Sequence, residues 1–406
     1  MYNKQQLLLS RFFLIFIAGL AALGPFSVDA YLPVLPDLAR SLNSSTASAN
    51  LTISMFMLGM AIGQFFGGPL SDQLGRKRIG LIGLIIFLVA SALIVASNSI
   101  EQILLLRLLQ AIGSGFATVI CLAQVRDIFP ADQVARKFAN IVMVILIAPM
   151  IAPIIGTFLA VWGWRSIFIA LTIYGAIIFA IYSILIPETN ADLPDNFAAK
   201  EIYRGYWAAI TKRTDGRLIG LRLALFSGFN AGVLFSYITN AAFIFIEHFQ
   251  LSQIQFSMMF AALVLTLMIG NRLTVYLLNT RTAPEIFSAV NSFQIFAATL
   301  LLLFCYFTQP ELWVVSSGMA ILVFCHGAIS SASGGYFISL YNKNIGAAAS
   351  LNSTSMFAFG GLIGGLASVL ANGQLLPIIA VMLTSSLIAR ILIISIRPTT
   401  TGTDNI

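Results

Sequence analysis

The sequence predicts an all-α membrane protein with twelve transmembrane helices in two six-helix halves. Twelve long apolar runs follow one another along the chain, and one polar stretch, residues 187–218, separates the first six from the last six. The composition agrees, because 59% of the 406 residues are hydrophobic and only 9% are charged. A water-soluble domain of this size cannot bury that much apolar surface.

Each apolar run is long enough to cross a bilayer, which takes about 20 predominantly apolar residues. We expect the spans at residues 10–33, 46–69, 77–97, 100–124, 137–160, 165–186, 219–246, 254–278, 286–307, 311–332, 346–370 and 374–396. The first run, preceded by Lys4 and Arg11, resembles a signal peptide. We expect it to remain as an uncleaved span, because it is long and completes an even number of spans.

The net charge of +7 has a topological explanation. If the N-terminus is cytoplasmic, nearly all Lys and Arg residues fall in cytoplasmic loops, and the outer loops keep only Arg40 and Arg165. The positive-inside rule therefore predicts that both termini are cytoplasmic. Because the basic residues lie between apolar runs rather than on one face, we expect no binding of nucleic acid.

The polar stretch defines the domain organisation that we expect. Residues 1–186 form an N-terminal six-helix half, residues 187–218 a cytoplasmic linker, and residues 219–406 a C-terminal six-helix half. This arrangement is typical of a duplicated transporter that binds substrate between its halves. Within the linker, the amphipathic segment FAAKEIYRGYWAAI predicts a short helix on the inner surface, with Tyr206 and Trp207 at the membrane interface.

The residues that commonly carry catalysis or metal binding are sparse. Cys121, Cys305 and Cys325 lie inside apolar runs without paired spacing, so we expect helix packing rather than disulfides or a metal site. We find no phosphate-binding loop and no H-E-x-x-H cluster, which argues against an ATPase and against a membrane-embedded enzyme. We therefore expect no cofactor, and an ion gradient remains as the energy source.

The segment GPLSDQLGRKRIGL, residues 68–81, carries the strongest motif. An ordinary positive-inside loop would explain its cations but not the spacing of Gly68, Asp72 and Gly75. The segment resembles the G-x-L-x-D-x-x-G-R-K/R signature of the major facilitator superfamily, which implies the major facilitator fold. The resemblance assigns Asp72, with Gly68, Gly75, Arg76 and Lys77, to a conformational latch that holds inner helix ends together in one state, partly against a helix N-terminus.

Two further segments narrow the resemblance. RLLQAIGSG, from Arg107 onward, is similar to the R-x-x-Q-G-x-G element of the fourth span, and Arg107 and Gln110 match it. APMIAPIIGTF is similar to the Gly-Pro element of the fifth span of antiporters through Pro153 and Gly156. Pro149 and Pro153 lie one turn apart, and we expect them to weaken or bend this helix.

Together with DAYLPVLPDLA, VRDIF and FIFIEHF, these segments resemble the Bcr/CflA group of drug-resistance transporters, whose named members export bicyclomycin or chloramphenicol. The resemblance implies proton-coupled export of small amphipathic compounds across the bacterial inner membrane, by a protein that we expect to be monomeric. A dedicated exporter of an endogenous product, such as an amino acid or a siderophore, shares every motif and remains an alternative. An uptake symporter is a further alternative.

Asp29 and Arg107 are the charged residues that call for a functional explanation. By helix rise, Arg107 lies roughly 10 Å from the outer end of span four and Asp29 roughly 6 to 10 Å from that of span one. Opposite charges at such depth commonly mark ion or proton pathways. We expect the two side chains to pair and Asp29 to carry the proton. The alternatives are a fixed salt bridge between the two helices, or an Asp29 that faces outer solvent.

Polar side chains on otherwise apolar spans are candidates for contact with a substrate, together with the abundant Phe and Met residues. These candidates are Tyr31, Gln64, Gln110, Asn230, Tyr237 and Asn240. Hydrogen bonds between helices explain them equally well. For His326, inside span ten, we expect a buried neutral imidazole rather than a proton relay.

Overall fold

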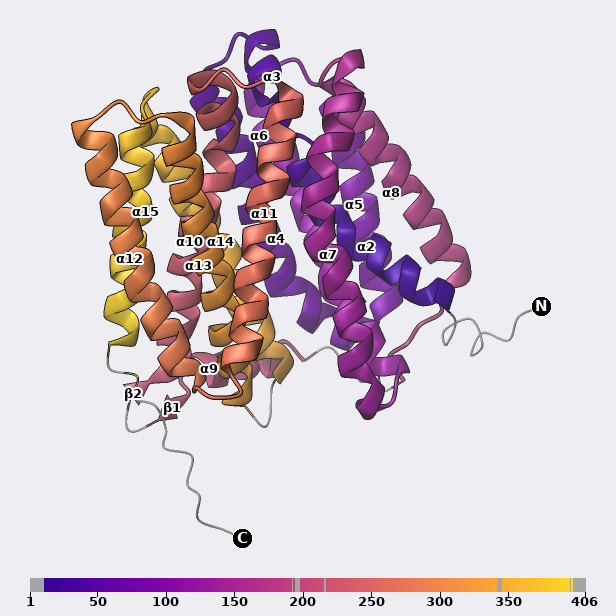
Figure 1. Cartoon of the computed structure of the whole chain (residues 1–406). Coiled ribbons are helices and arrows are strands. Elements are labelled where there is room, and N and C mark those ends of the chain that lie inside the picture. Colours follow the sequence, from indigo (N-terminus) through magenta and orange to yellow (C-terminus); the bar gives the residue numbers. More distant parts are fainter. Residues whose placement is uncertain are drawn as a thin grey trace.

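A computed structural model describes residues 11–394, apart from 192, 194–197, 215–216 and 342–344, together with Ile396. Twelve of its helices are long and apolar enough to cross a membrane, which confirms the number of spans expected from the sequence. They run side by side in two groups (Figure 1). The end of the bundle at which α9 lies, the lower end in Figure 1, is called the inner end here, and the opposite end the outer end.

The N-terminal group of elements precedes the linker. It comprises α2 (Arg11–Asp29), η1 (Leu32–Val34), α3 (Leu35–Ser41), α4 (Thr46–Leu74), α5 (Arg76–Ala96), α6 (Ile100–Ile128), α7 (Ala131–Leu159), η2 (Ala160–Trp162) and α8 (Arg165–Leu185). The linker holds α9 (Ala199–Ile210) and a two-stranded antiparallel hairpin, β1 (Arg213–Thr214) and β2 (Arg217–Leu218), in which Arg213 pairs with Leu218.

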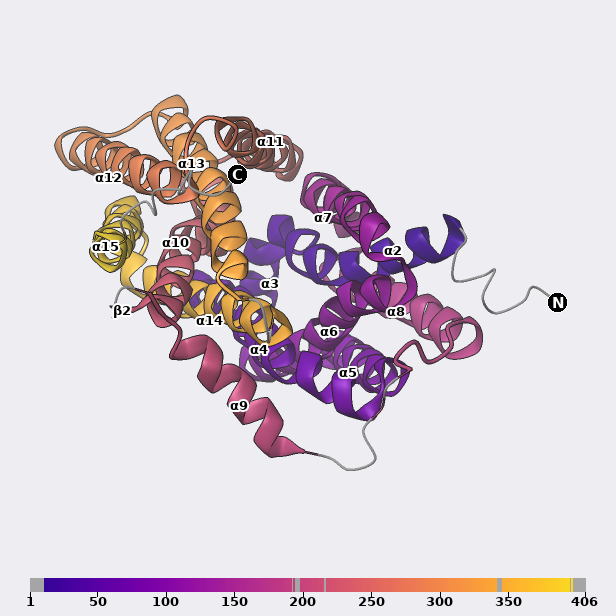
Figure 2. The same ribbon diagram turned by 90° about the horizontal axis from the view of Figure 1, so that it is seen from below.

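The C-terminal group follows the hairpin. It comprises α10 (Ile219–Ala242), the π-helical turn η3 (Phe243–His248), α11 (Gln253–Leu277), α12 (Ala283–Phe307), α13 (Leu312–Ser339), α14 (Ile345–Ala371) and α15 (Leu375–Ile393). Seen from the inner end, the two groups lie on opposite sides of the molecule, with α4 and α14 between them (Figure 2).

The first span is longer than expected and is not one continuous helix. It extends from Phe12 to Ser41, and the α-helix ends at Asp29. Two prolines, Pro33 and Pro36, follow in η1 and α3. Both lie in the first turns of these helices, where the missing backbone N–H group of proline costs no helical hydrogen bond and its fixed φ angle favours a new start. Asp29 therefore lies at a break in the span, where its side chain is not confined to the regular face of a helix.

Helices within the N-terminal half approach each other through glycine. A Cβ atom at Gly59 of α4 would lie 2.2 Å from the carbonyl oxygen of Leu108 in α6, and one at Gly63 would lie 2.5 Å from that of Ile112. Such contact of backbones is how small residues bring membrane helices together without a hydrophobic driving force. It brings α6, and Arg107 with it, against the core of this half.

The two halves are fastened to each other at their outer ends. The hydroxyl of Thr46 donates to the carboxylate of Glu247 at 3.0 Å, and Gln253 Nε2 donates to Asp37 Oδ2 at 2.8 Å. A turn further in, Asn50 Nδ2 donates to Asn240 Oδ1 at 3.4 Å. Each bond joins a residue of one half to a residue of the other, so the outer entrance between the halves is closed in this structure.

Candidate functional site

Arg107 lies in the interior of the N-terminal half and is fully buried. Its Nη1 donates to the carbonyl oxygen of Ser27 at 2.9 Å and to Gln110 Oε1 at 2.7 Å. Aromatic rings surround the guanidinium, with centroids 5.1, 4.4 and 5.8 Å from its central carbon for Tyr31, Phe56 and Phe168. The positive charge is thus stabilised by main-chain oxygen and by cation–π contacts.

Gln110 and Tyr31 help to form the surroundings of Arg107. Gln110 Nε2 donates to Ser91 Oγ of α5 at 2.8 Å, while its Oε1 accepts from Arg107 within α6, so both ends of this amide are engaged. The hydroxyl of Tyr31 lies 3.2 Å from that of Thr52, and the ring covers the guanidinium. For these two substrate-binding candidates the structure thus supplies the alternative explanation, hydrogen bonds between helices.

Asp29 does not pair with Arg107, which contradicts the expectation of an ion pair. Among the described residues, the carboxylate has neither a hydrogen bond nor an ion pair, although its residue is only 5% exposed. It lies close enough to Tyr237 of α10 to interact with it electrostatically. Arg107 Nη1 instead binds the carbonyl of Ser27 and the amide of Gln110, and Nε and Nη2 have no hydrogen-bond partner among the described residues.

Tyr237 is the residue of the C-terminal half that interacts electrostatically with Asp29. Its ring is buried against Phe260 and Phe245, with centroids 5.9 and 6.4 Å away. Its hydroxyl is buried and has no hydrogen-bond partner among the described residues. A buried carboxylate and a buried hydroxyl, both without partners, thus lie near each other between the halves, where a substrate or a proton could satisfy them.

The other polar candidates are buried, and two of them form hydrogen bonds between helices. Asn240 bonds to Asn50 across the outer closure, and Gln64 is buried in α4. Asn230 Nδ2 lies 3.0 Å from Nδ1 of His326, joining α10 to α13 within the C-terminal half. His326 is buried, as expected, but the sequence did not indicate its contact with Asn230, because the two are 96 positions apart.

Gly156 of α7 packs directly on the chain beside Asp29. A Cβ atom there would lie 1.8 Å from the carbonyl oxygen of Ala30. Both Pro149 and Pro153 lie inside α7, which runs without interruption from Ala131 to Leu159. The carbonyl oxygen of Pro153, in turn, accepts a hydrogen bond from Ser257 of the other half at 3.1 Å. This part of α7 therefore touches both the break after Asp29 and the C-terminal half.

We expect Gly156→Ala to destabilise the protein by about 1–3 kcal/mol, the usual cost of overpacking, and to lower transport by displacing the end of α2. Thermal unfolding in detergent and transport in vesicles measure the two effects. Gly334→Ala in α13 is the matched control, because a Cβ atom there meets nothing within 4 Å. A Gly156→Ala protein as stable and as active as Gly334→Ala would contradict the predicted contact.

The segment 68–81 forms the turn between α4 and α5 at the inner end. Gly75 has a φ angle of +98°, a conformation that L side chains rarely adopt. Gly68 allows close approach of α14, since a Cβ atom there would lie 3.0 Å from Ser350 Oγ. These positions explain in physical terms why the motif carries glycine at both places.

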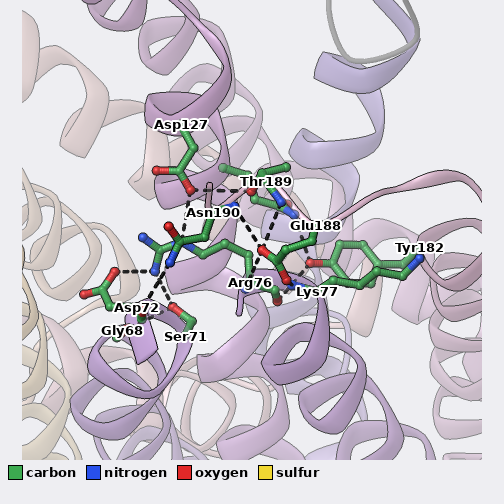
Figure 3. A network of polar contacts seen from close by, with 11 residues as sticks. Gly68, Ser71, Asp72, Arg76, Lys77, Asp127, Tyr182, Glu188, Thr189 and Asn190 are labelled. Carbon is green, nitrogen blue, oxygen red and sulfur yellow. Dashed lines mark hydrogen bonds and ion pairs between the residues drawn. The ribbon is translucent and has the colours of Figure 1, made fainter. Parts of the chain in front are cut away.

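Arg76 is the centre of the polar network in this turn (Figure 3). Its side chain is buried, forms an ion pair with Asp72, and donates from Nε to Asp127 Oδ2 at 3.0 Å and from Nη1 to Ser71 Oγ at 2.7 Å. Lys77 Nζ donates to the carbonyl oxygen of Ser183 at 2.8 Å. The network thus joins α4, α5, α6 and α8 of one half.

The acid at the N-terminus of α5 is Glu188, a residue outside the motif. The carboxylate of Glu188 accepts hydrogen bonds from the backbone N–H groups of Arg76 at 2.9 Å and Lys77 at 3.0 Å, the first residues of α5 (Figure 3). Asp72 instead pairs with Arg76, one helical turn away. Helix N-termini favour a carboxylate because of their free N–H groups and the helix dipole.

Glu188 and Asp127 were not among the candidate residues from the sequence. They lie 112 and 51 positions from Arg76, so no local spacing indicates them. The only available signal was the occurrence of an acid directly after two apolar spans, in VRDIF and in IPETN. Tertiary packing alone brings both acids to the turn.

Two six-helix groups joined by a linker, with a buried carboxylate between them and a charged turn at one end, define this protein as a membrane transporter of the two-half type. The family model for the Major Facilitator Superfamily matches residues 12–365. The chain belongs to this superfamily, and it is therefore a multi-pass membrane transporter with a small-molecule substrate.

Relatives in sequence and in structure agree with this assignment. The chain is 27% identical to a bicyclomycin resistance protein homolog of Haemophilus influenzae, over 94% of each chain. It is 33% identical to the multidrug resistance protein MdtL of Shewanella oneidensis, over 43% of this chain and 44% of that one. Its fold matches the crystal structure of a bacterial homolog of the human lysosomal transporter Spinster, with a TM-score of 0.70, 15% identity and coverage of 97% and 96%.

Proposed function

We propose that the protein exports small amphipathic compounds, including antibiotics, in exchange for protons by alternating access. The single observation that carries the proposal is the position of Asp29: a buried carboxylate at a break in the first span, without a hydrogen bond to any described residue and beside Tyr237 of the other half. An ionisable group inside a membrane costs free energy to bury, and such groups commonly mark the pathway of a substrate, an ion or a proton. The drug-resistance names of the two relatives support export of drugs.

In this proposal Asp29 exchanges its proton as access alternates. It takes up a proton from outside as substrate leaves, and releases it when substrate enters from the cytoplasm. Arg107 biases this exchange through α2, since it holds the carbonyl of Ser27 two residues before Asp29. The state described here, with Thr46 bonded to Glu247 and Asp37 to Gln253, is the one closed to the outside.

The orientation in the membrane is part of the proposal. The inner end is the cytoplasmic face of the bacterial inner membrane, and both termini are cytoplasmic, because the positive charges of the loops gather there. Residues 1–186 and 219–406 move as two bodies, and residues 187–218 connect them. The protein acts as a monomer, performs no chemical reaction on its substrate, and needs no metal or cofactor.

Substrate-driven proton movement in vesicles tests the proposal. Purified protein is reconstituted into vesicles that contain a pH-sensitive dye and maintain a pH gradient, and bicyclomycin, chloramphenicol and unrelated amphipathic compounds are added in turn. Exchange predicts that substrate and protons move in opposite directions, and that several unrelated compounds cause the movement. Movement in the same direction would show a symporter. A response to one metabolite alone would show a dedicated exporter.

A further inference from the structure

The exposed face of the linker helix α9 carries two cations and two aromatic rings in one stripe. Lys200, Tyr203, Arg204 and Trp207 follow the i, i+3, i+4, i+7 spacing of a single helix face, and all four are exposed. Tyr203 is 63% and Trp207 55% exposed, and their rings stack with centroids 6.0 Å apart. The structure thus presents a preformed aromatic pair that alternates with two positive charges along one face.

The opposite face of α9 fixes the direction in which this stripe points. Tyr206 stacks on Phe65 of α4 at 4.3 Å between centroids, and its hydroxyl donates to the carbonyl oxygen of Phe65 at 2.5 Å. Burial raises the pKa of Tyr206 to about 12, so the hydroxyl keeps the proton that it donates. Tyr341 donates to the carbonyl oxygen of Ala209 at 2.7 Å. With this face held against the bundle, the stripe must point away from it. Tyr206, expected at the membrane interface, is instead buried against the bundle, and Tyr203 is an exposed tyrosine of α9.

The contacts of α9 place it along the last turns of α4, from Gln73, which exchanges hydrogen bonds with Ala198, to Phe65. Phe65, which Tyr206 contacts, lies about 14 Å along α4 from the end of that helix at Leu74, by helix rise. From the inner end, α9 lies on the outside of the α4 and α14 pair (Figure 2). An exposed surface at the level of the last turns of the spans meets phospholipid headgroups. Tyr and Trp favour this interfacial zone, and Lys and Arg there attract anionic lipids.

We infer that the stripe of α9 is a binding site for anionic phospholipid headgroups. The two cations bind the phosphate, and the stacked Tyr203 and Trp207 insert at the boundary between headgroups and acyl chains. The helix also contacts both halves, because Tyr206 packs on α4 and Gly205 packs against Ala347 of α14. A bound lipid therefore stabilises a segment that bridges the two halves. This inference does not depend on which compound is transported.

Quenching of Trp207 by brominated lipids tests the inference. Trp207 is the only one of the four tryptophans at the inner end, since Trp162, Trp164 and Trp313 lie at outer ends of helices. The full chain is reconstituted in phosphatidylcholine vesicles doped with equal fractions of brominated phosphatidylcholine or brominated phosphatidylglycerol. The signal of Trp207 is the difference between the wild-type protein and Trp207→Phe.

We expect brominated phosphatidylglycerol to quench Trp207 more strongly than brominated phosphatidylcholine. The double substitution Lys200→Gln and Arg204→Gln removes the preference, whereas Arg281→Gln, which removes an exposed cation elsewhere at the inner end, keeps it. As a second measurement, added phosphatidylglycerol raises the unfolding temperature of the wild-type protein but not of the double variant. Equal quenching by both lipids, no quenching by either, or an unchanged preference in the double variant would each overturn the inference.

Discussion

Replacing Asp29 by Asn abolishes substrate-driven proton movement while the protein remains folded. An amide cannot release a proton, and it is less costly to bury than a carboxylate without partners. The variant should therefore unfold at the same temperature as the wild-type protein or at a higher one, and it should still bind substrate. The dye-filled vesicles described above measure the proton movement, and a thermal melt in detergent measures the stability. The expected flux is that of vesicles without protein.

Two further substitutions make the Asp29 experiment specific. Asp29→Glu keeps a titratable group on a longer side chain and should retain part of the flux. Glu101→Gln neutralises an exposed carboxylate at the start of α6 and should leave the flux unchanged. Proton movement that persists unchanged in Asp29→Asn would remove Asp29 as the carrier and would leave it with a structural role only.

Replacing Arg76 by Ala has the largest expected effect on stability. The guanidinium is buried and binds Asp72, Asp127 and Ser71 at once. Breaking a fully buried ion pair costs about 3–5 kcal/mol because the remaining charge is left without a partner. We expect a smaller loss here, since the Asp127 side chain is 17% and that of Asp72 55% exposed, and water screens the charge that remains. The joint between α4, α5 and α6 at the inner end should loosen, and both the unfolding temperature and the rate of transport should fall.

The matched control for Arg76 is its neighbour two positions along the chain. Arg78 is exposed, so Arg78→Gln removes the same charge from the same loop without opening the network. Arg76→Lys keeps the charge but not the planar set of donors, and we expect an intermediate loss. If Arg76→Ala and Arg78→Gln had equal effects, net charge at the inner end, rather than the network, would explain the motif.

The sequence predicted more of the fold than of the contacts between side chains. Hydropathy predicts the twelve spans because a segment that crosses a bilayer must form all its backbone hydrogen bonds within the protein, as a long apolar helix does. The glycines of the turn at 68–81 could be recognised because a turn is local: the φ angle of Gly75 depends on a few neighbouring residues. The expected pairing of Asp29 with Arg107 failed because depth along a helix does not determine direction. Hydropathy predicts one continuous span here and does not reveal that the helix ends at Asp29.

By itself, the sequence determined the class of protein, the number of spans and the turn that marks the superfamily, since apolar run length and local spacing are properties of consecutive residues. Only the tertiary structure decided which charges meet. It placed Glu188 rather than Asp72 at the start of α5, Gln110 and aromatic rings rather than Asp29 around Arg107, and Tyr206 against the outside of α4. The physical reason is that the partners of a buried side chain come from segments far apart in sequence, and the packing of the helices decides which of these segments meet.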